Sequence, residues 1–340
     1  MRKIVEIQKK LLPDLLQVME KRHKILHQIY LSGTIGRRTL ATNVDLTERV
    51  LRSELEILRA QGLLEIGAAG MALSESGRQL VEEMEPILKE LFGLSELEET
   101  VRQAFGLKRV VIVPGDSDSS DHIKRELGLA GSRVLRDSLS SGDVVAVMGG
   151  STMARMASQF ATPMQLRDNW FVPARGGLGE SVDYQANTIV SELAKRTGAR
   201  YRMLHVPDHL SEEAYQTLMQ EPNVRDVVDM IRSARIVVHG IGDALTMARR
   251  RKLRNDTKDE LVKDGALAEA FGYYFDRSGK VVHRMATAGL RLEDIEAAGM
   301  VIGIAGGSSK GEAIASVMRF GHDDVLVTDE AAAIEALRHV

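Results

Sequence analysis

The pattern of apolar positions changes near residue 108. Before this point apolar residues recur at helical spacing, whereas after it short apolar runs alternate with amphipathic stretches. Apolar runs without polar alternation are typical of parallel strands, because helices cover both faces of such a sheet. Seven runs have this character: Arg109–Val113, Val144–Met148, Trp170–Pro173, Tyr201–Val206, Arg235–His239, Met300–Ala305 and Val325–Thr328.

Segments with helical periodicity lie between these runs, for example Ala186–Arg196, Leu261–Ala270 and Gly311–Phe320. Strand and helix alternating this often predict an α/β fold with a doubly wound, Rossmann-like parallel sheet over residues 108–340. Ligands of such sheets bind at the carboxyl ends of the strands.

Residues 1–74 predict a winged helix-turn-helix. An amphipathic helix over residues 14–31 precedes a short helix at Arg37–Ala41. Thr47 is a good N-cap for a third helix that reaches about Ala60. Two short apolar runs around the turn at residues 67–70 predict the hairpin of the wing. The third helix should bury Val50, Leu51, Leu55 and Leu58 and expose Glu48, Arg49, Arg52, Ser53 and Glu56.

Residues 75–107 predict a helical segment that links the two domains or mediates oligomerisation. Its apolar residues recur at helical spacing, and Pro86 should bend or end the helix. The apolar stripe needs a partner, either in the same chain or in a second subunit. The sequence leaves both alternatives open.

The charge distribution suggests a partner for the first domain. Residues 1–70 carry 12 Lys and Arg against 8 Asp and Glu, whereas the remainder is net acidic. Arg49 and Arg52 start the exposed face of the third helix, where side chains reach base edges in the major groove of double-stranded DNA. Arg37 and Arg38 are better placed for phosphates. The alternative is a set of solvated arginines, or a winged helix that contacts protein.

Composition excludes several classes of protein. The chain has no Cys, which excludes disulfide scaffolds and Cys nucleophiles, and its histidines lack metal-ligand spacing. No apolar run approaches the roughly 18–20 residues of a membrane span, and the first residues do not form a signal peptide. We therefore expect a cytoplasmic protein with no membrane partner, no metal and no cofactor.

Glycine-rich turns follow four of the predicted strands, at residues 149–154, 173–180, 239–243 and 306–311. Glycines let a backbone close on an anion, and a helix that starts there adds partial positive charge. One such turn is weak evidence, but four at one sheet edge are stronger. Cationic residues lie in or near them: Arg175, Lys310 and Arg249–Arg251.

These features predict a small anionic ligand, most plausibly a phosphorylated sugar. The sequence has no Gly-Lys-Ser/Thr loop and no dinucleotide fingerprint at the first strand. Glu269 is the best candidate to bind a sugar hydroxyl, and Gln185 is the second. Two cationic clusters, Lys310 with its loop and Arg249–Arg251, favour a bisphosphate over a monophosphate.

Taken end to end, the chain resembles the SorC family of bacterial sugar-responsive transcriptional regulators. The most specific stretches are residues 171–180 and 269–275. Further residues that carry the resemblance are 8–16, 35–38, 48–52, 115–118 and 305–310.

The resemblance implies a non-enzymatic repressor of a glycolytic operon that binds operator DNA and senses fructose 1,6-bisphosphate. It implies an effector domain similar in fold to sugar-phosphate isomerases and deaminases, in a homo-oligomer that is dimeric and becomes tetrameric on DNA. By resemblance, Gly149, Gly150, Ser151 and Thr152 hold one phosphate with Lys310. Arg175, Arg250 and Arg251 hold the other, while Gln185 and Glu269 bind hydroxyls. Ser151 departs from the expected Thr but keeps the hydroxyl.

Two alternatives stay open. The second domain could be an active sugar-phosphate isomerase or deaminase, for which Asp264 and Glu269 are the candidate bases. The repressor could also respond to a different phosphorylated sugar.

Overall fold

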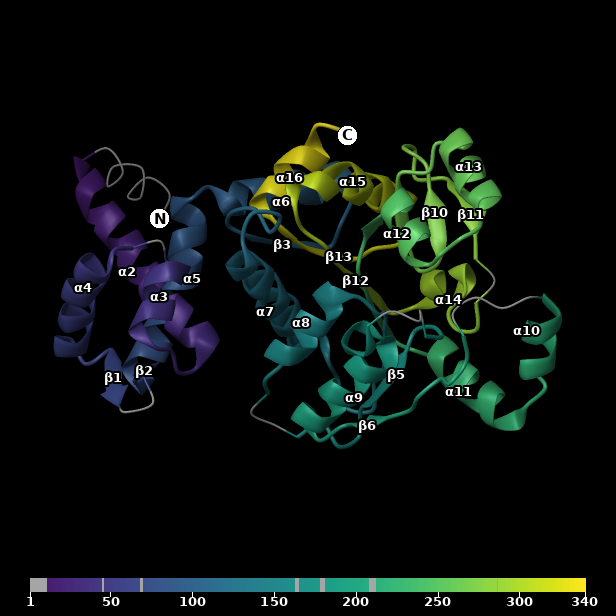
Figure 1. Ribbon diagram of the computed structural model, residues 1–340, viewed down its shortest axis with the longest axis horizontal. Coiled ribbons are helices and arrows are strands. Elements are labelled where there is room, and N and C mark those ends of the chain that lie inside the picture. The colour runs from purple at the N-terminus through teal and green to yellow at the C-terminus, as the bar shows by residue number, and fades with distance from the viewer. Residues whose placement is uncertain are drawn as a thin grey trace. The chain divides into compact units, whose positions relative to one another are not determined.

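The computed structural model describes residues 11–44, 46–67, 70–162, 165–177, 181–207, 212–285 and 287–340. The chain divides into two compact units, residues 1–96 and 97–340, and each is described by itself. Figure 1 shows the elements of both units.

The first unit is the predicted winged helix. Its elements are α2 (Pro13–Ser32), α3 (Arg37–Asn43), α4 (Glu48–Ala60), β1 (Leu64–Gly67), β2 (Gly70–Leu73) and α5 (Glu75–Leu91). The strands form an antiparallel hairpin, and Ile35 adds a bridge to Met71. The turn residues 68–69 lie outside the described part. Leucine and isoleucine side chains from the helices and the hairpin form one apolar core.

Helix α4 differs from the predicted pattern at Val50, and it also buries a glutamate that the pattern had assigned to neither face. Val50 was expected to face inward but is 41% exposed, whereas Glu54 is 7% exposed. Glu54 can be buried because Lys21 and Arg22 of α2 both form ion pairs with it. Burial alone would raise the pKa of Glu54, but the bonds to Lys21 and Arg22 outweigh it and lower the pKa. These ion pairs hold α4 against α2, so two basic residues of this unit, Lys21 and Arg22, make contacts within the protein.

Helix α5 continues through Pro86 to Leu91. Its buried residues Leu88 and Leu91 pack with Leu16 and Met19 of α2, so part of the predicted stripe finds its partner within the chain. Ile87 is 43% exposed on the same helix. Helix α6 (Leu94–Phe105) follows.

The second unit is built on a seven-stranded sheet in which every pairing is parallel. Its strands follow the order β3 (Arg109–Val113), β13 (Val325–Asp329), β12 (Met300–Ile304), β7 (Ile236–His239), β4 (Val144–Val147), β5 (Trp170–Pro173) and β6 (Arg200–Tyr201). Each of the seven predicted runs supplies one strand, which confirms the doubly wound α/β prediction. At the sheet edge, only the start of the run Tyr201–Val206 is paired.

Helices cover this sheet. Side chains of α7 (Asp121–Ser138), α8 (Ser151–Gln159) and α9 (Ala186–Thr197) form one core with alternate strand residues. Helices α11 (Pro222–Arg232) and α16 (Glu330–Leu337) also contact the strands but contribute nothing to that core, as expected for the opposite face. The remaining helices of this unit include η1 (Val182–Tyr184), α10 (Glu212–Leu218), α14 (Leu292–Ala297), η2 (Ser308–Lys310) and α15 (Gly311–Phe320).

A second, four-stranded antiparallel sheet was not predicted. It consists of β11 (Val281–Arg284), β10 (Tyr273–Phe275), β9 (Ala268–Ala270) and β8 (Gly242–Asp243). It packs with α12 (Ala244–Arg250) and α13 (Asn255–Lys263) in a small core. The predicted helix Leu261–Ala270 is therefore wrong. Helix α13 ends at Lys263, Gly265 takes a φ of +71°, and the chain continues as β9.

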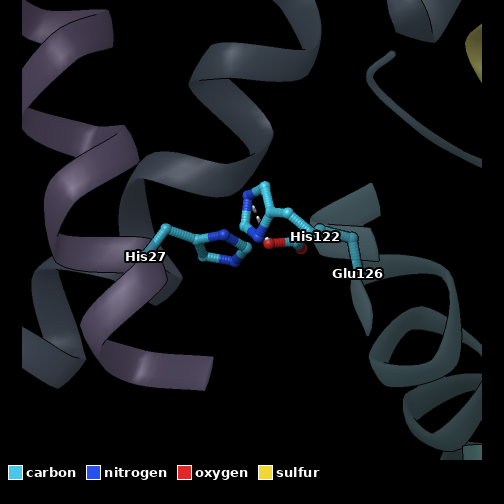
Figure 2. A group of neighbouring side chains, drawn as sticks. All are labelled: His27, His122 and Glu126. Atoms are coloured by element: carbon cyan, nitrogen blue, oxygen red, sulfur yellow. Dashed lines mark ion pairs between the residues drawn. The ribbon is translucent and has the colours of Figure 1, made fainter. Parts of the chain in front are cut away.

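On α7, His122 and Glu126 lie one turn apart, with His122 Nε2 3.5 Å from the carboxylate (Figure 2). This pair carries opposite charges only when the imidazole is protonated.

None of the described helices has the length and apolarity needed to cross a membrane.

Candidate functional site

A cavity of about 340 Å³ lies at the carboxyl ends of β4 and β7. The chain leaves β4 toward β5 and β6 and returns to β7 on the other side of β4, so this is the topological switch point of the sheet. Open α/β sheets bind ligands at such points. The residues around the cavity are Met148–Met153, Arg175, Gly240–Asp243, Thr246, Met247, Arg250, Arg251, Glu269, Phe271, Ser309 and Lys310.

The structure brings together nine of the ten residues predicted to bind an effector. They come from five separate segments of the chain, namely residues 149–152, Arg175, Arg250 with Arg251, Glu269 and Lys310. The tenth residue, Gln185 at the start of α9, is not among the lining residues. Residues 178–180, the last part of the glycine-rich turn at 173–180, lie outside the described part of the chain, as do residues 8–10.

The first glycine-rich turn leads from β4 into an open helix end. Gly150 is the N-cap of α8 with φ +126° and provides no side-chain cap. Among the described residues, no acceptor is found for the amide groups of Ser151 and Thr152, which are in the first turn. A Cβ on Gly149 would lie 2.8 Å from the carbonyl oxygen of Tyr184. The loop therefore presents backbone donors and the positive end of a helix dipole to the cavity.

The second glycine-rich turn, residues 306–310, is closed by carboxylates. The amide of Gly307 donates to Asp329 Oδ2 (2.7 Å), and that of Ser309 donates to Asp118 Oδ2 (2.8 Å). The amide of Ser308 donates to Asp116 Oδ1 (3.2 Å). These donors are therefore already bonded within the protein. Ser309 and Lys310 are the residues of this turn that line the cavity.

Two buried arginines share one carboxylate on the cavity wall. Glu269 Oε1 accepts from Arg251 (2.7 Å), from the Gly272 amide (2.9 Å) and from Arg175 (3.4 Å). All three charged side chains are at most 6% exposed. Burial of a carboxylate is tolerated here because it is paired and hydrogen-bonded. Glu269 thus lies on strand β9 as a fixed acceptor that orders both arginines.

Arg250 and Lys310 differ from that triad. In the part of the chain that the structure describes, neither side chain makes an ion pair within 4.0 Å. Loss of hydration by burial lowers the pKa of Lys310; the nearby charge of Arg250 lowers it further, and Asp118 opposes both effects. Two cations therefore lie beside one cavity with no carboxylate of the described residues within 4.0 Å, an arrangement that an anion would stabilise.

Several residues that line the cavity are not among those predicted from the sequence, including Asp243 and Phe271. Asp243 caps α12 by accepting from the Thr246 amide (2.7 Å). Phe271 has a φ of +58°, which is unusual for a residue with a side chain. Its ring packs against buried His239 with the centroids 4.0 Å apart and the two planes tilted by 37°. Asp243 lies in a glycine-rich turn and Phe271 in the stretch 269–275, so the signals were present. Asp264, a candidate base, is exposed and is not among the lining residues.

The predicted DNA-binding residues lie on and before α4. Thr47 is the N-cap, and its side chain accepts from the Val50 amide (3.4 Å). Arg49 and Arg52 are exposed on α4, as is Arg37 at the start of α3. Arg38 is also exposed and lies 3.8 Å from Glu48. The arginines are accessible from solvent, as a recognition surface requires.

The two units match two families. A family model described as the CggR N-terminal DNA binding domain matches residues 18–88, and one described as a sugar-binding domain matches residues 89–338. Together with the fold, these matches define the chain as a transcriptional regulator that joins a DNA-binding domain to a sugar-binding domain, and not as an enzyme.

Full-length relatives make the assignment more specific. The chain is 48% identical over 339 residues to the central glycolytic genes regulator of Priestia megaterium. It is 44% identical over 338 residues to the regulator of the same name in Bacillus subtilis, and each alignment covers 99% of both chains. The chain belongs to the family of central glycolytic genes regulators.

Solved structures agree with this assignment. A SorC family transcriptional regulator from Enterococcus faecalis has 42% identity and a TM-score of 0.67, over 71% of this chain and 99% of that one. The full-length sorbitol operon regulator SorC of Klebsiella pneumoniae has a TM-score of 0.67 over 89% of this chain and 94% of that one. At 18% identity, the latter likeness concerns the fold alone.

Proposed function

We propose that this protein represses the genes of a glycolytic operon and that fructose 1,6-bisphosphate, bound in the cavity, relieves the repression. The observation that carries the effector proposal is the meeting of an uncapped helix end with two cations at one cavity. Ser151 and Thr152, whose amides have no acceptor among the described residues, line the cavity together with Lys310 and Arg250. Neither cation has a described carboxylate within 4.0 Å. The names of the 48% and 44% identical relatives support glycolytic genes as the target.

In this proposal one phosphate binds at the start of α8, where backbone amides and the helix dipole favour an anion. Lys310 adds a full charge beside it. The second phosphate binds near Arg250, with Arg175 and Arg251 held in place by Glu269. Sugar hydroxyls bind the remaining acceptor groups of Glu269 and the side chain of Gln185.

The effector acts by changing DNA affinity. A ligand can do so only if it binds the DNA-competent and the incompetent arrangements of the protein unequally. The cavity is lined by separate segments of the second unit, so a bisphosphate that joins them would favour one arrangement. We propose that this weakens the cooperation of two dimers on the operator.

The first experiment measures effector binding without DNA. Isothermal titration calorimetry with fructose 1,6-bisphosphate, fructose 6-phosphate and glucose 6-phosphate should give the strongest binding for the bisphosphate. Replacing Arg250 with Ala should weaken bisphosphate binding by about tenfold or more and monophosphate binding much less. The matched control is Arg249→Ala, because Arg249 is exposed on the same helix but does not line the cavity. Equal losses for both sugars would favour a monophosphate effector.

The second experiment measures DNA binding. Gel retardation on the upstream region of a glycolytic operon should show a complex that fructose 1,6-bisphosphate weakens. Arg49→Ala and Arg52→Ala should each weaken the complex by about tenfold, whereas Arg59→Ala, exposed near the end of α4, should change it little. Affinity should also fall steeply with salt concentration. A complex whose DNA affinity is the same with and without every sugar phosphate tested would contradict the proposal.

A further inference from the structure

The loop that carries Lys310 is bound by carboxylates from two strand ends. Asp116 and Asp118 follow β3, and Asp329 ends β13. Asp329 Oδ2 accepts from the amides of Ser117 (2.9 Å) and Gly307 (2.7 Å), so one buried oxygen joins both loops. The two donors, Ser117 and Gly307, are about 190 positions apart in the sequence.

Asp116 fixes the next residue of the Lys310 loop. Its Oδ1 accepts from the amides of Asp118 (2.9 Å) and Ser308 (3.2 Å), and its Oδ2 accepts from the Ser308 hydroxyl (2.9 Å). Burial alone would raise the pKa of Asp116, but these hydrogen bonds outweigh it and lower the pKa. Asp118 then accepts from the Ser309 amide (2.8 Å), one residue before Lys310.

These bonds determine where the Lys310 side chain leaves the backbone. The amide of Lys310 donates to the Gly307 carbonyl (2.9 Å), which closes a single 3-10 turn over Ser308–Lys310. Helix α15 begins at the next residue. The turn before Lys310 is thus held by three successive amide–carboxylate bonds, while Lys310 itself lines the cavity.

We propose that Asp116 and Asp118 are positioning residues of the effector site, which hold the Lys310 ammonium in the cavity without touching the ligand. Neither carboxylate is among the cavity-lining residues. The inference rests on the proposed function, because it concerns the anion that Lys310 would bind. Asp118 is exposed and Asp116 is only partly buried, so both side chains can be replaced without leaving a large cavity in the core.

The test compares Ala and Asn at both positions by calorimetric titration with fructose 1,6-bisphosphate. Asp116→Ala and Asp118→Ala should each weaken binding by about tenfold or more, because a misplaced group loses much of its interaction. Asp116→Asn and Asp118→Asn keep an acceptor oxygen and should restore most of the affinity. The matched control is Asp121→Ala, an exposed carboxylate at the start of α7. Ala variants that bind as tightly as the wild type would overturn the proposal.

A double-mutant cycle separates positioning from a general loss of structure. If the aspartates act through Lys310, Asp116→Ala should change affinity by less than about threefold in a Lys310→Met background. Equal losses with and without Lys310 would contradict the proposal. In the ligand-free protein, acylation of Lys310 by an amine reagent, mapped by mass spectrometry, should be faster in the Ala variants. Unchanged acylation would also count against it.

Different results would contradict the effector site and the positioning role of the aspartates. If the wild-type protein binds no sugar phosphate at all, the proposed effector is wrong and this inference falls with it. If the wild type binds fructose 1,6-bisphosphate and Lys310→Met weakens binding, the effector proposal stands. The aspartate variants then decide the positioning role alone.

Discussion

The two glycine-rich turns after β4 and β12 read alike in the sequence but are built differently. Both contain two glycines followed by hydroxyl residues, at 149–152 and at 306–309. In the first, the amides that open α8 have no acceptor among the described residues. In the second, three successive amides donate to aspartates. The first turn can bind an anion through its backbone, whereas the second can do so only through side chains.

The glycines also serve different purposes. A Cβ on Gly306 would lie 2.5 Å from Asp329 Oδ2, and one on Gly307 would collide with Asp118. Nothing lies within 4 Å of the corresponding position at Gly150. In the second turn the missing side chains make room for the protein's own carboxylates. In the first, the space at Gly150 is open. A glycine-rich turn after a strand is therefore not by itself a phosphate site.

The largest effect should come from a negative charge in the first turn. Ser151→Asp places a carboxylate where we propose a phosphate, so affinity for fructose 1,6-bisphosphate should fall by about 100-fold or more. The melting temperature should not fall, because an acidic residue at a helix N-terminus is stabilising by about 0.3–1 kcal/mol. Calorimetry and thermal unfolding measure both quantities.

The matched control for this variant is Ser158→Asp, at the exposed far end of the same helix. It adds the same charge away from the cavity, so affinity should stay within about threefold while stability falls slightly. Loss of affinity in the control but not in Ser151→Asp would place the anion elsewhere.

The next largest effect should come from Lys310→Met, with a loss of about 10- to 100-fold in bisphosphate affinity. The pKa of Lys310 is lowered, mainly by burial. As pH rises through this lowered pKa the ammonium loses its proton, so wild-type affinity should fall over that window. Titrations over the pH range below the ordinary pKa of a lysine should show this decline in the wild type and not in the variant. Parallel pH profiles would show that Lys310 does not bind the anion.

The titration of Lys310 should also change the stability of the ligand-free protein, but in the opposite direction: stability should rise with pH where affinity falls. Between the lowered pKa of folded Lys310 and its ordinary value, the unfolded chain binds more protons than the folded one. The free energy of unfolding of the wild type should therefore rise with pH in that window. Lys310→Met should lack this rise and should be more stable at neutral pH.

The sequence predicted the main sheet well because buried parallel strands have a simple signature. Each apolar run between residues 108 and 340 became a strand of that sheet. The second sheet escaped because strands such as β8 and β9 have only two or three residues, too few for any periodicity. The error at Leu261–Ala270 has the same origin, since the apolar residues of β9 and of the segment before it continued the spacing of α13.

The sequence was sufficient to predict most residues of the site, but not the hydrogen bonds and ion pairs between them. Lys310, Arg250 and the first turn were identified from residue type and position after strands. That Glu269 orders Arg175 was not predictable, because these residues are 94 positions apart. The hydrogen bonds between the second turn and its carboxylates were not predictable for the same reason. Asp116, for example, precedes its partner Ser308 by 192 positions. Sequence shows which groups exist, but pairing depends on the tertiary fold.

A smaller effect should separate the two turns by stability. Gly150→Ala and Gly307→Ala both place a side chain at positive φ, +126° and +103°. Backbone strain should therefore lower the free energy of unfolding in both variants. Only Gly307→Ala also displaces Asp118 and so breaks its bond to the Ser309 amide. We expect Gly307→Ala to lower the free energy of unfolding by about 1 kcal/mol more than Gly150→Ala. Urea unfolding measures the difference, and an equal cost at both positions would mean that the contact with Asp118 has no energetic weight.

The smallest effect should come from Ser308→Ala. The Ser308 hydroxyl donates to Asp116 Oδ2 at 2.9 Å, and Ser308 is exposed and does not line the cavity. The amide bond to Asp116 remains in this variant, so affinity for fructose 1,6-bisphosphate should change by less than about threefold and stability by about 0.5 kcal/mol. Titration of Ser308→Ala beside Thr152→Ala makes the comparison direct, because Thr152 lines the cavity in the first turn. A loss at Ser308 that equals or exceeds the loss at Thr152 would show that the hydroxyl of the second turn binds the ligand, and the two turns would then be alike after all.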